Sequence, residues 1–294
     1  MSEGASRFRT YLLITVVYLF WGSNFVISKF ALNEMPSALA AGMRALLAGA
    51  LLYAVYRVMQ GEGRPPLRRD EIPRLALLGV FGISVNQVCF LAGLSITSAS
   101  HAAIVIGMTP FMVLFLAWLR GQEVFTWKRV AGLCVAVVGV LILQKPSPSA
   151  QSASLIGDLL ILGAGASFSY YTVYGKELAA EHGAMAVLSV SFLAGGVLLL
   201  PVTLYFAKGF DFGAVSTRAW LSFGYMTVVS SVLCSIGWAI ALKRVTASRI
   251  SAFSYLQPLV ATLMAIPMLG EPITATLVGG GGLIMAGVYL SERA

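Results

Sequence analysis

The side chains that could act on a solute are amides, hydroxyls and aromatic rings placed inside long apolar stretches. Asn24, Asn86 and Gln87 lie within such stretches, and an amide there must find a partner in protein or water. Polar residues at helical spacing in an apolar helix mark the face that looks into a bundle or a water-filled cavity. The pattern indicates binding of a small solute. The alternative is that each amide only joins neighbouring helices.

Aromatic and hydroxyl groups recur at the same spacing on further stretches. Trp21 and Trp238 lie away from the interface positions in which tryptophan ordinarily anchors a membrane helix. A cavity with such a lining would suit a solute that has an apolar body and polar ends. For His101, a satisfied polar side chain is the alternative to a titrating gate. The predicted substrate-binding residues are Trp21, Asn24, Asn86, Gln87, His101, Tyr171, Tyr174, Ser231, Trp238 and Tyr255.

The sequence lacks the residue patterns of metal binding, covalent catalysis and ATP hydrolysis. Cys89, Cys134 and Cys234 all lie in apolar stretches, which predicts no disulfide and no metal site. No nucleophile or paired-carboxylate constellation is present, and there is no glycine-rich phosphate loop for ATP. The twelve acidic residues all fall in tails, loops or the ends of stretches. We therefore expect no enzyme and no cofactor, and the absence of a mid-membrane carboxylate disfavours a proton-coupled drug carrier.

The elements that position these residues are membrane helices. Of 294 residues, 58% are hydrophobic and only 11% are charged, too few to cover a surface exposed to water. Apolar stretches of this length must be helical in lipid. The prediction is an all-α membrane protein with ten transmembrane helices at about 11–31, 37–57, 73–94, 98–119, 128–144, 155–177, 184–206, 218–241, 247–268 and 273–290.

The basic residues predict the orientation of the chain. With both termini in the cytoplasm, 15 of the 20 basic residues lie on the cytoplasmic side, as the positive-inside rule requires. We expect a multi-pass protein of the bacterial inner (plasma) membrane with a cytoplasmic tail at residues 1–10. The net charge of +8 comes from scattered loop residues and forms no basic helix face, so no nucleic-acid partner is expected.

The sequence repeats itself at a fixed offset. Residues 94–140 align with 242–288 without a gap, with the informative matches Pro110/Pro258, Glu123/Glu271, Gly132/Gly280 and Gly139/Gly287, and Trp21–Lys29 corresponds to Phe168–Lys176. The unit contains five spans, so the second copy enters the membrane upside down. This predicts two inverted five-helix repeats, 11–145 and 146–294, around a central cavity, an architecture typical of secondary transporters.

Two prolines and three basic residues could serve the transport cycle. Pro110 and Pro258 interrupt the fourth and ninth spans and could act as hinges, or simply fix a kink. Lys29 and Arg44 are expected near the outer ends of the first two spans, with Lys176 in the mirrored cytoplasmic position. Their long stems could snorkel to water, or their charges could attract the carboxylate of an amino acid at a gate.

The chain carries a further set of motifs: the segment Leu19–Phe25 (LFWGSNF), Lys29, Met43-Arg44-Ala45, and the paired Pro, Gly-x-Glu or Gly-Glu, and Gly positions of both halves. In these motifs it resembles the drug/metabolite transporter superfamily, in particular its ten-helix EamA-type exporters. The resemblance is greatest to amino-acid exporters of the aromatic type.

It implies a central cavity, alternating access and the outward movement of amino acids, aromatic or broad, and related metabolites. The expected partners are small amphipathic solutes and the lipid bilayer, with a monomer as the simplest oligomeric state. The alternatives are a multidrug or nucleotide-sugar carrier of the same superfamily, and a membrane sensor or scaffold that transports nothing.

Overall fold

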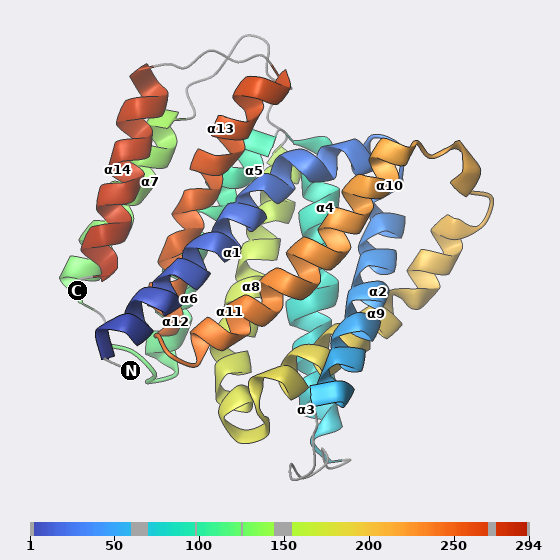
Figure 1. Cartoon of the computed structure of the whole chain (residues 1–294), viewed down its shortest axis with the longest axis horizontal. Helices are drawn as coiled ribbons and strands as arrows, with labels where there is room; N and C mark the ends of the chain where they lie inside the picture. Colours follow the sequence, from blue (N-terminus) through green and yellow to red (C-terminus); the bar gives the residue numbers. More distant parts are fainter. Residues whose placement is uncertain are drawn as a thin grey trace.

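Helices account for all the secondary structure in the part of the chain described by the computed structural model, residues 3–59, 70–97, 99–124, 126–143, 155–269 and 275–292. They pack as one bundle of long, mostly antiparallel helices (Figure 1). The all-helical class agrees with the prediction from the apolar stretches.

The first half of the chain runs through five successive stretches of helix. These are α1 (Glu3–Leu32), α2 (Ser37–Met59), the series α3 (Ile72–Gly79), η1 (Val80–Val85) and α4 (Asn86–Ile96), the pair α5 (Ala99–Ile106) and α6 (Thr109–Leu119), and α7 (Trp127–Leu143). The η1 segment is a π-helix, a local widening of the helix that is frequent at functional sites. Its inner residues Gly82, Ile83 and Ser84 are buried.

The second half follows the same order. Its elements are α8 (Leu155–His182), α9 (Ala184–Ala207), the short η2 (Phe212–Ala214), the series α10 (Thr217–Gly224), η3 (Tyr225–Leu233) and α11 (Cys234–Leu242), the series α12 (Ala247–Ala252), η4 (Phe253–Tyr255) and α13 (Leu256–Leu269), and α14 (Ala275–Glu292). A π-helix, η3, again divides the third stretch. The matching order extends the sequence repeat to the level of local structure.

The structure differs from the prediction at the start of the first span and at the two prolines. Residues 3–10, predicted as a tail, belong to α1, since a helix satisfies its own backbone and can continue past the apolar segment into water. Pro110 does not kink a continuous helix: α5 ends at Ile106, and Pro110 lies in the first turn of α6. Pro258 similarly lies in the first turn of α13, after the 3₁₀ turn η4. A first-turn proline costs no helical hydrogen bond.

Helices of the first half pack directly against helices of the second. Helix α2 packs along α9, α7 along α14, α4 along α8 and α1 along α13. The α7–α14 pair is close because Gly132 and Gly287 let the backbones touch: a Cβ at Gly132 would lie 2.5 Å from the backbone nitrogen of Ser291. Small residues at such crossings replace the hydrophobic effect as the source of packing in lipid.

Five of the described helical stretches are long and apolar enough to cross a membrane: 7–32, 37–58, 72–96, 184–207 and 217–242. Large apolar side chains on the outside of the bundle, including Leu12, Leu51, Leu198 and Leu221, are exposed. The outward apolar surface suits lipid rather than water. The start of α1 and the end of α14 lie at the same end of the molecule (Figure 1).

Candidate functional site

A cavity of about 130 Å³ lies at the centre of the bundle, lined by residues of both halves. One water molecule needs only about 10–15 Å³ by the same measure, so the space can hold several waters or a small solute. Its walls come from α1, α2, η1, α4 and the α5–α6 break of the first half, and from α8, α9, η3, α11, η4 and α13 of the second.

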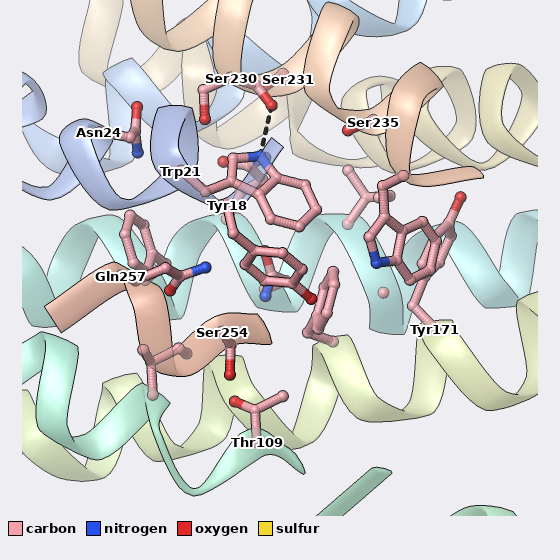
Figure 2. Close-up of a pocket in the computed structure, with 18 of the residues that line it drawn as sticks. Tyr18, Trp21, Asn24, Thr109, Tyr171, Ser230, Ser231, Ser235, Ser254 and Gln257 are labelled. Atoms are coloured by element: carbon pink, nitrogen blue, oxygen red, sulfur yellow. Dashed lines mark hydrogen bonds between the residues drawn. The ribbon is translucent and has the colours of Figure 1, made fainter. Parts of the chain in front are cut away.

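An aromatic wall runs across this cavity from one half to the other. It consists of Tyr18, Trp21, Phe168, Trp238 and Tyr171, all of which line the cavity. Their ring centroids follow one another at 5.3, 5.8, 5.4 and 6.1 Å, within the range of favourable aromatic contacts. The indole nitrogen of Trp21 donates a 2.9 Å hydrogen bond to the carbonyl of Ser230, which fixes that ring (Figure 2).

Arg44 lies in the cavity wall, deeper in the bundle than a position near the end of the second span would place it. The residue is only 6% exposed. Its Nε donates to the hydroxyl of Ser231 at 2.7 Å and its Nη2 to the hydroxyl of Ser230 at 3.3 Å, while Nη1 has no partner. Arg44 stands seven residues into α2, about 10 Å along the helix. At that depth the η3 hydroxyls are nearer partners than bulk water.

The three predicted amides all line the cavity, in different states. Asn86 donates from Nδ2 to the carbonyl of Ala164 at 2.9 Å, so part of its capacity joins α4 to α8. Asn24 is 3% exposed and its Oδ1 has no hydrogen-bond partner. Gln87 is buried beside them. An unpartnered buried amide oxygen is an acceptor available to a ligand or an ordered water.

Hydroxyl groups line the side opposite Ser230 and Ser231 (Figure 2). Thr109 and Ser254 are buried there, and neither hydroxyl has a partner. The predicted residue Tyr255 does not line the cavity: it is fully buried in a separate cluster with Leu114 and Leu133. The 3₁₀ turn of η4 shifts the helical face by about one residue, which turns Ser254 inward in its place.

Two further predicted site residues lie elsewhere. Tyr174 stacks on Tyr170 with ring centroids 4.4 Å apart, and the guanidinium of Arg120 lies over its ring. It is one turn beyond Tyr171 on α8, past the end of the cavity. His101 lies near the start of α5, and its side chain falls outside the described part of the structure.

Lys29 and Lys176 make matching contacts at the ends of helices. The Nζ of Lys29 donates to the carbonyl of Thr97, directly after α4, at 2.8 Å. The Nζ of Lys176 donates to the carbonyl of Val245, in the turn after α11, at 2.9 Å. Cations at helix C-termini satisfy free carbonyls and the helix dipole. Both lysines therefore join helix ends, a role that was not predicted from the sequence.

A series of hollows leads from one end of the bundle towards the cavity. A middle pocket of about 260 Å³ shares Tyr171 and Trp238 with the central cavity and extends to Lys176 and Lys243. Those two lysines also line a basic vestibule of about 740 Å³, together with Arg7, Thr10, Tyr11, Arg244, Val245, Thr246 and Arg249. The vestibule is therefore at the end at which α1 begins, and the Tyr171–Trp238 pair separates it from the cavity.

The charge of the cavity is one-sided. Among the described residues that line the cavity, Arg44 is the charged one, and no aspartate or glutamate is among them. In the same ranges, no group of three or more His, Cys, Asp or Glu residues is placed to hold a metal ion. The site therefore offers one cation, amides, hydroxyls and rings, which is equipment for binding a solute rather than for covalent chemistry.

Sequence reasoning missed several lining residues, among them Phe168, Ser230 and Gln257. A signal for Phe168 was present, because the repeat aligns it with Trp21, and the two rings touch across the cavity. Ser230 had no such signal, since the π-helix changes the helical phase at this point.

An apolar helical bundle with a buried polar cavity between its halves defines the class of integral membrane transport proteins. The sequence profile of the EamA-like transporter family matches residues 8–144 and 155–293. The chain belongs to this family. It is accordingly a membrane transporter and not an enzyme.

Curated relatives of the chain agree with this assignment. A "Probable amino-acid metabolite efflux pump" of Salmonella typhimurium is 30% identical over 290 residues, which cover 95% of this chain and 92% of that protein. An "Uncharacterized transporter" of Archaeoglobus fulgidus is 26% identical over 287 residues, which cover 97% of this chain and 99% of that protein. The "Uncharacterized inner membrane transporter YedA" of Escherichia coli is 26% identical over 273 residues, 91% and 87% of the two chains.

A solved structure, titled only "Crystal structure of protein", has the same fold. It superposes with a TM-score of 0.77 at 17% sequence identity, covering 96% of each chain.

Proposed function

We propose that this protein is a secondary transporter of the bacterial inner membrane that exports amino acids, aromatic or broad in range, and related small metabolites by alternating access. The observation that carries the proposal is the central cavity, in which a buried guanidinium and an unpartnered amide oxygen lie beside a wall of aromatic rings. An amino acid with an apolar side chain has the matching groups. The relative of Salmonella typhimurium, named as a probable amino-acid metabolite efflux pump, supports the same substrate class.

Alternating access is proposed together with an inverted pairing of the two halves. In this proposal residues 11–145 and 146–294 are five-helix repeats of ten membrane helices. The matching element order and the opposite directions of α1 and α8 support it (Figure 1). The contacts of Lys29 with Thr97 and of Lys176 with Val245 lie at equivalent positions of the two halves. Rocking of one repeat against the other would expose the cavity to each side in turn.

The direction of transport is proposed from the hollows and from the positive-inside rule. The basic vestibule lies at the end where α1 begins, and basic residues mark the cytoplasmic side. Solute would enter from the cytoplasm through the vestibule and pass the Tyr171–Trp238 pair. The break before Pro110 and the 3₁₀ turn before Pro258 are the proposed hinges, so a double change of both prolines to alanine should slow exchange. Unaltered exchange in that variant would remove the hinges from the mechanism.

Counterflow of labelled amino acids in proteoliposomes tests the transport proposal. We expect saturable exchange of phenylalanine, methionine or threonine. Exchange in Trp21→Leu should be strongly reduced, because the ring belongs to the aromatic wall. Trp127→Leu is the matched control, since Trp127 is 83% exposed at the start of α7. Exchange restricted to lipophilic cations would instead indicate a drug carrier, and exchange restricted to nucleotide sugars a carrier of those. No exchange of any solute would indicate a sensor or scaffold.

A pH gradient provides a second comparison in the same vesicles. Without a carboxylate in the described cavity lining, we expect exchange to proceed equally with and without the gradient. A strict requirement for protons would contradict this expectation and would direct attention to His101, the titratable residue near the start of α5.

A further inference from the structure

The Arg44 cluster is rich in donors and poor in acceptors. A guanidinium only donates hydrogen bonds, so the hydroxyl oxygens of Ser230 and Ser231 accept from Arg44. Each hydroxyl then keeps its own proton to donate to a third group. The free Nη1 of Arg44 adds further N–H donors, and the residue is 6% exposed. Three neighbouring groups in the cavity wall therefore offer hydrogen atoms to one missing acceptor.

The missing acceptor must also carry charge. An ionised side chain inside a membrane protein ordinarily pairs with an opposite charge. No carboxylate lines this cavity in the described part of the chain. The hydroxyls partly solvate the guanidinium but do not neutralise it. The remaining counter-charge must come from the solute, and a single guanidinium balances a single negative charge.

We propose that Arg44, Ser230 and Ser231 form a carboxylate-binding subsite, and that the carboxylate, rather than an amine, is the charged group that the cavity selects. This inference rests on the proposed function, because it concerns the solute of the same cavity. The substrates are then small monocarboxylates with an apolar, aromatic-sized body. Amino acids belong to this class, and so do carboxylic acids that lack an amino group.

The rest of the cavity fits this division of roles. The indole of Trp21, hydrogen-bonded to the Ser230 carbonyl, brings the aromatic wall next to the subsite, where it can pack against the solute body. Asn24 follows Trp21 by one helical turn, and its free Oδ1 can accept from an amino group. Asn24 offers the amino group no opposite charge, whereas Arg44 offers one to the carboxylate in bonds ionised on both sides, so the amino group is accepted but not required.

The basic vestibule provides an independent reason to expect an anion. Five of its lining residues are basic and none is acidic. A hollow lined by one sign of charge raises the local concentration of the opposite ion. The vestibule would thus concentrate anionic solutes outside the Tyr171–Trp238 pair, on the way to Arg44.

Binding by the purified full-length protein tests the subsite without relying on transport. The measurement is the rise in melting temperature in detergent with inorganic phosphate, as a competing anion, and with four organic probes: phenylalanine, 3-phenylpropionate, phenylalanine amide and 2-phenylethylamine. A ligand that binds only the folded protein raises its stability. We expect a rise with the first two organic probes and none with the last two. An equal rise with 2-phenylethylamine or the amide, a larger rise with inorganic phosphate, or no rise with either carboxylate would overturn the proposal.

Variants connect the effect to Arg44. In Arg44→Gln the half-saturating concentration of 3-phenylpropionate should increase by about tenfold or more, the effect of losing one charge-assisted bond, and Arg44→Lys should restore part of it. Arg120→Gln is the matched control, because Arg120 pairs with Glu177 outside the cavity. Unchanged binding in Arg44→Gln would overturn the proposal. If Arg44→Gln does not fold, Ser231→Ala against Ser95→Ala makes the same comparison.

The same probes separate the two proposals in the vesicle assay. If the protein exchanges no amino acid but carboxylates still raise its melting temperature, the transport proposal is refuted and the subsite proposal stands. Exchange of phenylalanine that 2-phenylethylamine inhibits as well as 3-phenylpropionate does would refute the subsite and leave transport standing.

Discussion

Gly82 is the position at which a single added methyl group should most directly disturb the cavity. It lies in the π-helix η1 and lines the cavity against the ring of Tyr171. A Cβ at Gly82 would stand 2.4 Å from Cδ2, 2.6 Å from Cβ and 2.8 Å from Cγ of Tyr171. Carbon atoms in contact prefer about 3.5 Å or more, so the ring would have to move by about 1 Å.

The size of the effect follows from this overlap. Tyr171 is 5% exposed and lies between Gly82 and Trp238, at the edge of the middle pocket. Its ring therefore has little room to move on the side that faces Gly82. Overpacking of this kind costs about 1–3 kcal/mol. At about 2 kcal/mol, the melting temperature of Gly82→Ala should lie roughly 4–8 °C below that of a glycine-to-alanine change in a helix without such an overlap. Exchange should also slow, because Tyr171 separates the cavity from the route to the vestibule.

Gly163→Ala provides the matched control for Gly82→Ala. A Cβ at Gly163, on α8, would lie 3.8 Å from the sulfur of Cys89, an ordinary contact. Both changes gain the same helix propensity of about 1 kcal/mol, so the difference between them isolates the overlap with the ring. Melting temperature and counterflow of phenylalanine should be measured on both variants.

The double variant Gly82→Ala/Tyr171→Leu makes the argument specific. If the overlap with the ring is the cause, the double variant should lose less stability than the sum of the two single changes. Equal melting temperatures and exchange rates for Gly82→Ala and Gly163→Ala would refute the reasoning. Strict additivity in the double variant would show that the methyl group acts on something other than Tyr171.

Two further predictions concern stability at the ends of the bundle. Glu123, 4% exposed, pairs with Arg129 at 2.9 Å and caps the first turn of α12. Glu123→Gln should lower the free energy of unfolding, measured in denaturant, by about 3 kcal/mol. The control is Glu177→Gln, at a partly exposed ion pair, which should lower it by less than about 1 kcal/mol. Equal losses of unfolding free energy in the two variants would contradict this prediction. Glu34 lies between α1 and α2 and accepts from the hydroxyl and N–H of Ser216, which lowers its pKa. Its contribution is present above the usual carboxyl value of 4.5 and is lost as pH falls through the lowered value. A scan of melting temperature against pH should show a smaller acid drop in Glu34→Gln, and identical curves would contradict it.

Much of the fold could be predicted because helices in lipid depend on local composition. A stretch of about 20 apolar residues must form a helix wherever it lies, since its backbone has no other partner there. The ends of α2, α7 and α9 therefore lie within about two residues of their predicted positions. Pro110 predicted an interruption of the fourth span, but not its division into two separate helices, α5 and α6, which depends on packing as well as on the proline.

The candidate site was predictable only where the helical phase is regular. Trp21 and Asn24 lie on an unbroken α-helix, and helical spacing identified them as lining residues. Ser230 and Ser254 lie in or beside π-helical and 3₁₀ turns, where each residue advances the helix by a different angle. An error of one residue in the helical phase is enough to predict Tyr255 as a cavity-lining residue when Ser254 lines the cavity.

The sequence by itself determined the class of this protein, its repeat and its family, because apolar length and repeated motifs are properties of the chain alone. Only the tertiary structure decided the chemistry of the cavity. It carried Arg44 to Ser230 and Ser231, some 186 residues away along the chain, and brought Trp21 against Phe168. The physical reason is that a polar group inside a membrane bundle hydrogen-bonds to the groups that lie nearest to it. Which distant helices lie next to each other depends on how the whole bundle packs, and the local sequence does not determine this.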